Sequence, residues 1–323
     1  MPRDERAERA RERTREALRR VRWPVARRLG VHPWGDERSR VRGPGIEYAD
    51  VREYQHGEDA RLIEWNLSAR SDRLFVREAQ PERGLDVWLL VDASRSLDWG
   101  TALCLKRDAA HELVAAAALL LTRHGSRVGA ILFDTSLRRI LPPAAGHHGR
   151  LALLARLEAE SATLPPPRRG RAGVGGNPTG RTDLAGALVS AGQLVRRPSL
   201  VVVISDFLVE PGWERPLKAL ALRHEVVAAR ISDPREAELP AIGVVHFEDP
   251  ETGRQLEVDT TSARLRERYR AAAAEQRDRL LRDLRRAGAV ALEVTTARPV
   301  LPQLVAFLRR RQSERRPLRA APA

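Results

Sequence analysis

The chain has 323 residues, of which 42% are hydrophobic and 31% are charged, and this composition is typical of a globular protein. No apolar run reaches the about 20 residues that a membrane-spanning helix needs, and the charged amino terminus does not resemble a signal peptide. The single cysteine, Cys104, excludes internal disulfides and zinc sites built from several cysteines. We therefore expect a cytoplasmic protein without a transmembrane segment.

The net charge of +14 lies mainly at the two ends of the chain. Residues 1–30 carry eleven arginines against five acids, and residues 307–323 carry six arginines against one acid. The long middle is therefore nearly balanced. We interpret the ends as solvated basic segments and expect no specific nucleic-acid partner. Binding of polyanions or nucleic acid through these tails is the alternative interpretation.

Composition divides the chain into four segments. Residues 1–30 form a basic segment that is helical or frayed, because it favours helix but has no apolar face. Residues 31–84 form a turn-rich annex. Residues 85–311 carry the pattern of one α/β domain, and residues 312–323 form a basic carboxyl-terminal tail.

Beyond Gly84, apolar runs alternate with helical patterns, which predicts a mainly parallel, doubly wound α/β sheet with helices on both faces. The predicted strands are Leu85–Val91, Arg127–Phe133, Leu200–Ile204, Val226–Ile231 and Val290–Thr295. The predicted helices are Leu103–His124, His148–Leu157, Leu184–Val195, Arg215–Arg223, Ala263–Arg286 and Pro302–Arg311. Two segments interrupt the alternation: a Pro/Gly/Arg-rich loop at 161–181 and an inserted hairpin at Val244–Val258.

Hydroxyl and carboxyl groups gather where strands of this sheet are predicted to end. Asp92, Ser94 and Ser96 follow the first strand, Asp206 follows the third, and Thr182 stands before a predicted helix. In open parallel sheets, ligands bind at the carboxyl ends of the strands, near the topological switch point. Oxygen ligands without His or Cys suit a hard cation. We expect Mg²⁺, with Mn²⁺ or Ca²⁺ as the other candidates.

These five residues, in this order behind these elements, resemble the metal-ion-dependent adhesion site of the von Willebrand factor type A fold. The resemblance implies that Ser94, Ser96 and Thr182 contact the ion directly, and that Asp92 and Asp206 hold it through water. Because the direct ligands are neutral hydroxyls, the ion keeps much of its charge and seeks a carboxylate from a protein partner. The other interpretation is that these side chains only cap helices and close turns.

The annex supplies a second resemblance. Its segment Gly43–Arg70 is similar to the signature of the bacterial domain-of-unknown-function family 58, which precedes a type A domain. The matching residues are Arg52, Glu53, Tyr54, Gly57, Asp59, Arg61, Trp65, Ala69 and Arg70. The resemblance extends over roughly residues 40–311. It implies an AAA+ ATPase of the MoxR type as a partner, because such an ATPase is often encoded beside family members. The membrane helices common near the amino terminus of the family are replaced here by a basic stretch.

The alternative from another class is a metal-dependent hydrolase of phosphate esters. Such an enzyme needs a general base or nucleophile beside the ion, and we find no free His, Lys or Cys at the predicted strand ends. The stretch Gly175–Thr182 resembles a P-loop, but Arg181 stands where a P-loop requires lysine, and no predicted strand precedes it. We therefore expect a non-enzymatic interaction module.

Overall fold

The computed structural model describes residues 51–77, with gaps at 55–62, 64 and 72, and residues 85–122, 126–162, 181–248 and 255–314. The chain divides into two compact units, one of residues 32–83 and one of residues 1–31 together with 84–323. The basic end segments expected at residues 1–30 and 312–323 lie outside the described residues except at 312–314, as does most of the loop expected at 161–181.

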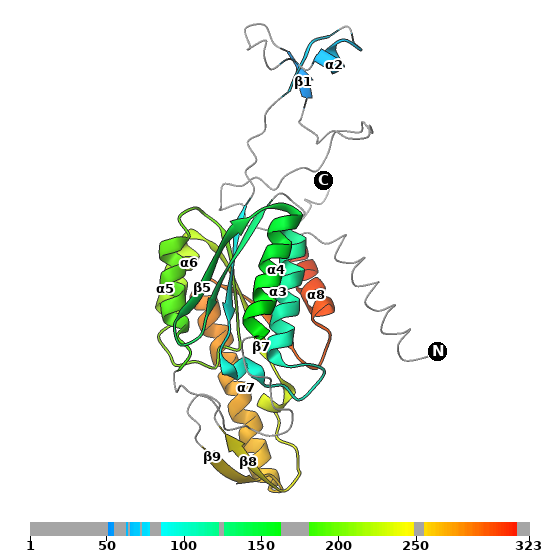
Figure 1. Ribbon diagram of the computed structural model, residues 1–323. Helices are drawn as coiled ribbons and strands as arrows, with labels where there is room; N and C mark the ends of the chain where they lie inside the picture. The colour runs from blue at the N-terminus through cyan, green and yellow to red at the C-terminus, as the bar shows by residue number, and fades with distance from the viewer. Residues whose placement is uncertain are drawn as a thin grey trace, which may run out of the picture. The chain divides into compact units, whose positions relative to one another are not determined.

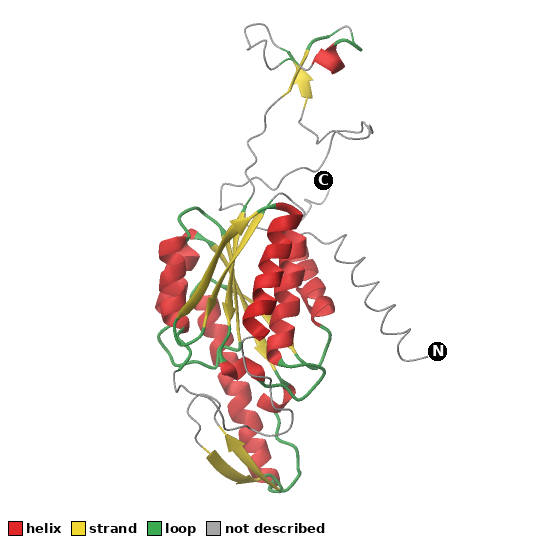
Figure 2. Ribbon diagram, viewed as in Figure 1, coloured by secondary structure: helices red, strands yellow, loops and turns green. Residues whose placement is uncertain are grey.

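A six-stranded sheet is the centre of the larger unit (Figure 1, Figure 2). The strands lie in the order β10-β7-β6-β3-β4-β5, and all neighbours are parallel except β4 and β5. Their bounds are β3 (Asp86–Asp92), β4 (Arg127–Phe133), β5 (Leu137–Ala144), β6 (Leu200–Ser205), β7 (Glu225–Ser232) and β10 (Val290–Thr295). From β3 the chain first adds strands on one side and then, from β6, on the other. The topological switch point therefore lies between β3 and β6.

Helices cover both faces of this sheet, because alternate residues of each strand point to opposite faces. Val87 and Leu89 pack against helices α3, α4 and α8, whereas Trp88 and Leu90 pack against α5, α6 and α7. The helices are α3 (Lys106–Thr122), α4 (Gly146–Ala162), α5 (Leu184–Leu194), α6 (Glu214–Arg223), α7 (Ala263–Arg286) and α8 (Val300–Glu314). The predicted α/β fold with a mainly parallel sheet is confirmed, and each predicted helix and strand has a counterpart. No helix among the described residues is long and apolar enough to span a membrane.

Strand β5 is the one sheet strand that the sequence analysis missed. It contains Pro142 and Pro143, which cannot donate to a ladder and which argue against a strand inside a sheet. The prolines are tolerated here because β5 lies at the edge of the sheet and pairs only with β4, with irregular register near Gly129. A Cβ at Gly129 would lie 2.7 Å from the Leu141 carbonyl oxygen, so the close approach of β5 requires glycine there.

The inserted hairpin is present, as predicted. Strands β8 (Val244–Glu248) and β9 (Gln255–Asp259) pair antiparallel, and the residues of their expected turn lie outside the described part of the chain. Figure 1 shows the hairpin beyond the sheet, beside the amino-terminal half of α7. Arg266 of α7 donates a hydrogen bond of 2.7 Å to the Thr260 carbonyl oxygen, which ties the helix to the end of β9.

The smaller unit contains two short strands and one helical turn. Strands β1 (Val51–Glu53) and β2 (Phe75–Arg77) pair antiparallel, and α2 spans Trp65–Ser68. The Ser68 hydroxyl accepts a hydrogen bond of 2.9 Å from the Phe75 amide. Several of the signature residues, namely Gly57, Asp59 and Arg61, lie outside the described residues. The sequence leaves two interpretations open for Arg52, Asp59, Arg61 and Arg70, namely an internal ion-pair network that fastens the annex to the domain or contact with a partner, and both stay predictions.

Candidate metal centre

The first part of the candidate site is the end of β3, which lies next to β6 at the switch point. Asp92 is the last residue of β3, and its carboxylate accepts hydrogen bonds from the Ser94 amide (2.9 Å) and the Ser205 hydroxyl (2.6 Å). The side chain is 3% exposed. Burial, and then the negative charge of Asp206, raise the pKa of Asp92 from 3.8 to about 7, although the hydrogen bonds from Ser205 and Ser94 oppose that shift.

The two serines occupy the turn that leaves β3. The Ser94 and Ser96 hydroxyl oxygens lie 3.0 Å apart, and Ser94 precedes a short 3₁₀ helix, η3 (Arg95–Asp98). The Ala93 amide donates to the Phe133 carbonyl oxygen (2.7 Å), which fixes the turn against the end of β4. Two hydroxyls therefore stand together beside the Asp92 carboxylate.

Asp206 reaches the same place from β6. It is 1% exposed, and its Oδ1 accepts a hydrogen bond of 3.0 Å from the Leu208 amide. The following residue, Phe207, has φ of 56°, a left-handed conformation that is strained for a bulky side chain. Phe207 packs edge-to-face on Trp213 with ring centroids 5.8 Å apart, which holds the strained turn in place. Such strain is characteristic of functional sites.

Thr182 lies at the same edge of the sheet, because the residue after it is hydrogen-bonded to the residue that follows β4. It is buried, and the next residue, Asp183, donates its amide to the Asp134 carbonyl oxygen (2.7 Å), just beyond the end of β4. Asp183 also caps α5, with its Oδ1 accepting from the Gly186 amide at 2.8 Å. The structure links Asp92, Ser94 and Ser96 by hydrogen bonds, and it places Asp206 close enough to Asp92 for their charges to interact. Thr182 lies in the loop that leads into α5.

The sequence analysis missed a buried lysine at this edge. Lys106 is the first residue of α3, and its Nζ lies 2.7 Å from Asp206 Oδ2 and 2.5 Å from Glu236 Oε1. Burial lowers the pKa of Lys106, but the Asp206 and Glu236 carboxylates more than reverse that effect and raise it above its ordinary value. The sequence predicts no free lysine at these strand ends, and Lys106, which is paired with two acids, does not contradict that prediction. One signal was present, since Lys106 is one of only two lysines among 57 basic residues.

Comparison with known proteins confirms the family resemblance seen in the annex. The family model described as "Protein of unknown function DUF58" matches residues 50–279. The chain belongs to the DUF58 family. The uncharacterized protein Rv1480 of Mycobacterium tuberculosis is 37% identical over 298 residues, which are 92% of this chain and 89% of that protein. The uncharacterized protein MAV169 of Mycobacterium avium is 40% identical over 172 residues, which are 53% of this chain and 94% of that protein.

Solved structures similar to this DUF58 chain include a conserved hypothetical protein and a von Willebrand factor type A protein. The conserved hypothetical protein BatB from Bacteroides thetaiotaomicron is 16% identical with a TM-score of 0.47, and the match covers 71% of this chain and 98% of BatB. A von Willebrand factor type A protein from Catenulispora acidiphila is 16% identical with a TM-score of 0.32, and the match covers 59% of this chain and 42% of that one.

The side chains of this DUF58 site fit a hard divalent cation. They offer two carboxylates and neighbouring hydroxyls, and Asp92 is a buried acid held close to a second one. Within the described residues, no three His, Cys, Asp or Glu side chains gather into a metal cluster. The donor set is instead rich in neutral oxygen, which suits Mg²⁺ with part of its water shell retained.

Exposed apolar residues stand within a few positions of site residues in the sequence. Trp99 and Leu208 are each 40% exposed and Leu103 is 68% exposed. Trp99 contacts Lys106, with Nζ 5.8 Å from its ring centroid, and Leu208 follows Asp206 by two residues. Exposed apolar groups beside a polar centre are a feature of protein-binding surfaces.

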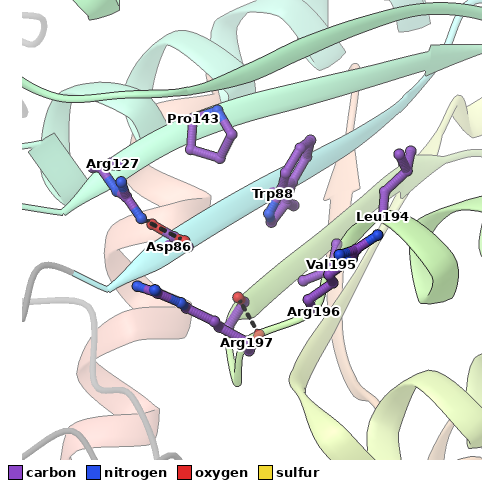
Figure 3. Close-up of a pocket in the computed structure, with 9 residues that line it drawn as sticks. Asp86, Trp88, Arg127, Pro143, Leu194, Val195, Arg196 and Arg197 are labelled. Carbon is purple, nitrogen blue, oxygen red and sulfur yellow. Dashed lines mark hydrogen bonds and ion pairs between the residues drawn. The ribbon is translucent and has the colours of Figure 1, made fainter.

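A cavity lies at the opposite edge of the sheet, at the start of β3. Its volume is about 220 Å³, and it is lined by Asp86 at the start of β3 together with Trp88, Arg127, Arg197 and neighbouring residues (Figure 3). Arg127 forms an ion pair with Asp86 there, with Nε 2.7 Å from Oδ1. Beside Asp92 and Ser94 lies a cavity of about 20 Å³.

The raised pKa of Asp92 predicts how the stability of this DUF58 protein depends on pH in the presence of a chelator. The unfolded carboxyl titrates near pH ~4, and the folded one has a pKa of about 7, so the folded chain holds a proton that the unfolded chain has lost between these values. The contribution of Asp92 is therefore most favourable below pH ~4 and falls as pH rises through 7, by an amount on the order of a few kcal/mol.

Asp92→Asn is expected to remove this dependence, so the variant should gain stability relative to the wild type as pH rises from 5 to 8. Urea unfolding in EDTA at both pH values measures the difference. If the free energies of unfolding of variant and wild type differ by the same amount at both pH values, the raised pKa of Asp92 is contradicted.

Proposed function

We propose that this chain is a non-enzymatic, metal-dependent protein-interaction module. The observation that carries the proposal is the convergence of Asp92, Asp206 and the Ser94 and Ser96 hydroxyls at the switch point of the sheet. The Asp92 carboxylate is buried and lies close to the negative charge of Asp206, and both effects, burial first, raise the pKa of Asp92. A pair of acids held at that cost, beside a strained turn, is typical of a binding centre and not of simple turn closure.

Each residue has a role in this proposal. Ser94, Ser96 and Thr182 supply neutral oxygens to the ion, and Asp92 and Asp206 orient the water molecules that complete its shell. The ion is Mg²⁺, with Mn²⁺ or Ca²⁺ as alternatives, and it supplies a positive charge at an open coordination position. Because its direct protein ligands are neutral, that position attracts a carboxylate.

The surroundings favour an acidic partner with apolar neighbours. Arg95, Arg107 and Arg138 all lie close enough to Asp98 to lower its pKa against the larger effect of burial, which raises it. Arg107 is paired with Asp98 and Arg138 with Asp134, so the exposed Arg95 is the residue that adds positive charge at this edge. Leu103 and Trp99 add exposed apolar surface. A carboxylate flanked by apolar side chains would complement both features.

We propose a MoxR-type AAA+ ATPase as the protein that presents this carboxylate. The proposal comes from the DUF58 family resemblance, since such ATPases are often encoded beside family members. The test is capture of the purified ATPase from the same genome on immobilised chain, in Mg²⁺ and in EDTA. Capture should require Mg²⁺, and equal capture in EDTA would rule out metal-dependent recognition.

Leu103→Ser is expected to weaken this capture about tenfold without changing Mg²⁺ affinity, because it removes exposed apolar area at the contact and no ligand of the ion. Leu222→Ser is the matched control, since Leu222 is 80% exposed near the end of α6, whose last turn leads into the start of β7 at the opposite edge. Biolayer interferometry measures capture and calorimetry measures Mg²⁺ affinity. Equal losses in both variants would mean that the partner does not bind this edge.

A further inference from the structure

Lys106 is fixed as a buried cation at the edge of the proposed metal centre. Its side chain is 2% exposed, and its Nζ lies 2.7 Å from Asp206 and 2.5 Å from Glu236. The Trp99 ring lies on a further side, with its centroid 5.8 Å from Nζ. The ammonium group donates hydrogen bonds to both acids, and the Trp99 ring adds a cation–π contact.

The two acids are themselves held in position to receive this lysine. Asp206 uses its other oxygen, Oδ1, to accept from the Leu208 amide at 3.0 Å. Glu236 lies in the short 3₁₀ helix η4 (Pro234–Glu236), and its Oε2 accepts from the Asp233 amide at 3.2 Å. The Lys106 amide donates to the Trp99 carbonyl oxygen at 2.9 Å. Because Lys106, Asp206 and Glu236 each take part in a further hydrogen bond, the ion pair has a fixed position in the site.

The lysine pairs with only one of the two acids of the centre. It neutralises Asp206, whereas no lysine or arginine among the described residues forms an ion pair with Asp92. A divalent ion that arrives at these acids meets a permanent positive charge already bound to one of them. Within a site of low effective dielectric, like charges a few ångströms apart repel strongly.

We propose that Lys106 is the internal counter-cation of this metal centre. It neutralises Asp206 when no divalent ion is bound, so the fold does not depend on the ion, and its charge lowers the affinity of the centre so that the ion loads reversibly. This inference rests on the metal centre of the proposed function, and it adds a residue outside the five that the sequence predicts.

Two substitutions in the same ion pair test the proposal because they should act in opposite directions. Lys106→Met keeps the length of the side chain and removes its charge, so Mg²⁺ should bind at least about tenfold more tightly. Glu236→Gln removes a negative charge that faces Lys106 without touching Asp92 or Asp206, so Mg²⁺ should bind more weakly. A merely structural role for the pair would weaken binding in both variants.

Thermal unfolding provides a second measurement. In EDTA, Lys106→Met should melt roughly 10 °C below the wild type, because it leaves two buried carboxylates without their cation. Saturating Mg²⁺ should raise its melting temperature by more than it raises that of the wild type. Lys106→Arg keeps the charge, and it should show a Mg²⁺ shift close to that of the wild type.

The outcomes separate this inference from the proposed function. If the wild type binds Mg²⁺ and Asp92→Asn does not, but Lys106→Met binds no more tightly than the wild type, the counter-cation role is overturned and the metal centre stands. If only Lys106→Met binds Mg²⁺, the lysine role is supported and the metal-dependent function of the native chain fails. If none of them binds, both fail. If Lys106→Met does not fold at any Mg²⁺ concentration, Lys106→Gln takes its place, because glutamine removes the charge but keeps a donor toward the two acids. Tighter Mg²⁺ binding by Lys106→Gln than by the wild type supports the proposal, and unchanged or weaker binding overturns it.

Discussion

Asp92→Asn is expected to abolish detectable binding of Mg²⁺ and Mn²⁺ while the fold remains intact. Asparagine has the shape of aspartate, so its amide oxygen can accept from the Ser94 amide and its amide nitrogen can donate to the Ser205 hydroxyl. The negative charge that holds the metal-bound water is lost. We expect the Mg²⁺ affinity to fall about 100-fold, which is the upper end of the range for loss of a carboxylate that does not contact the metal directly.

Asparagine is a sharper choice than alanine at this position. Asp92 is 3% exposed and accepts from two buried donors, so Asp92→Ala would leave the Ser94 amide and the Ser205 hydroxyl without their acceptor. A loss of metal binding in that variant would not distinguish a missing ligand from a damaged turn.

Calorimetric titration with Mg²⁺ and Mn²⁺ decides the matter, with near-ultraviolet circular dichroism as the measure of packing. Asp108→Asn is the control, because Asp108 lies in the first turn of α3, two residues from Lys106, and is an exposed acid that accepts from the Leu105 amide. It changes the net charge by the same amount near the same edge. Indistinguishable titrations of wild type and Asp92→Asn would eliminate the metal centre.

The strands that build the site could be predicted because their sequences are continuous apolar runs. All six residues of β6 are buried, as are the last six of β3, and such runs are characteristic of strands covered on both faces. Once the strand ends are located, parallel topology brings Asp92 and Asp206 to one edge. The order of elements was therefore sufficient to predict where these acids would meet.

The parts that could not be predicted depend on contacts between distant segments. Lys106 lies 100 residues from Asp206 and 130 residues from Glu236 in sequence, and no sequence pattern around any of the three predicts that they pair. Strand β5 was missed for a different reason, since its prolines carry a local signal against strand that its edge position overrides.

Asp233 is the residue whose removal should cost the domain the most stability. It is 2% exposed at the end of β7. Its carboxylate accepts four hydrogen bonds, from the Thr101 amide (2.8 Å), the Thr101 hydroxyl (2.6 Å), the Thr296 hydroxyl (2.6 Å) and the Arg235 amide (3.0 Å). One side chain thus ties together the loop before α3, the turn after β10 and the helix η4 that carries Glu236.

Asp233→Ala should lower the free energy of unfolding by about 3–4 kcal/mol, because it leaves the buried Thr296 hydroxyl and three partly buried donors without their acceptor at once. Asp259→Ala is the control, since Asp259 accepts from Thr261 in a similar turn but is exposed, and its loss should cost little. Urea unfolding of the two variants gives the comparison. A cost for Asp233→Ala no larger than that of Asp259→Ala would refute the anchoring role.

The pH dependence of that difference provides a further check on the same prediction. Burial raises the pKa of Asp233, but the hydrogen bonds from Thr101, Thr296 and Arg235 outweigh burial and leave the pKa below its ordinary value of 3.8. A carboxyl whose folded pKa is depressed stabilises the fold above its unfolded pKa, and that contribution is lost as pH falls through the folded value. The gap between wild type and Asp233→Ala should therefore be full at pH 6 and should shrink below pH ~4. A gap that stays constant down to pH 2.5 would mean that the Asp233 charge contributes nothing to this anchor.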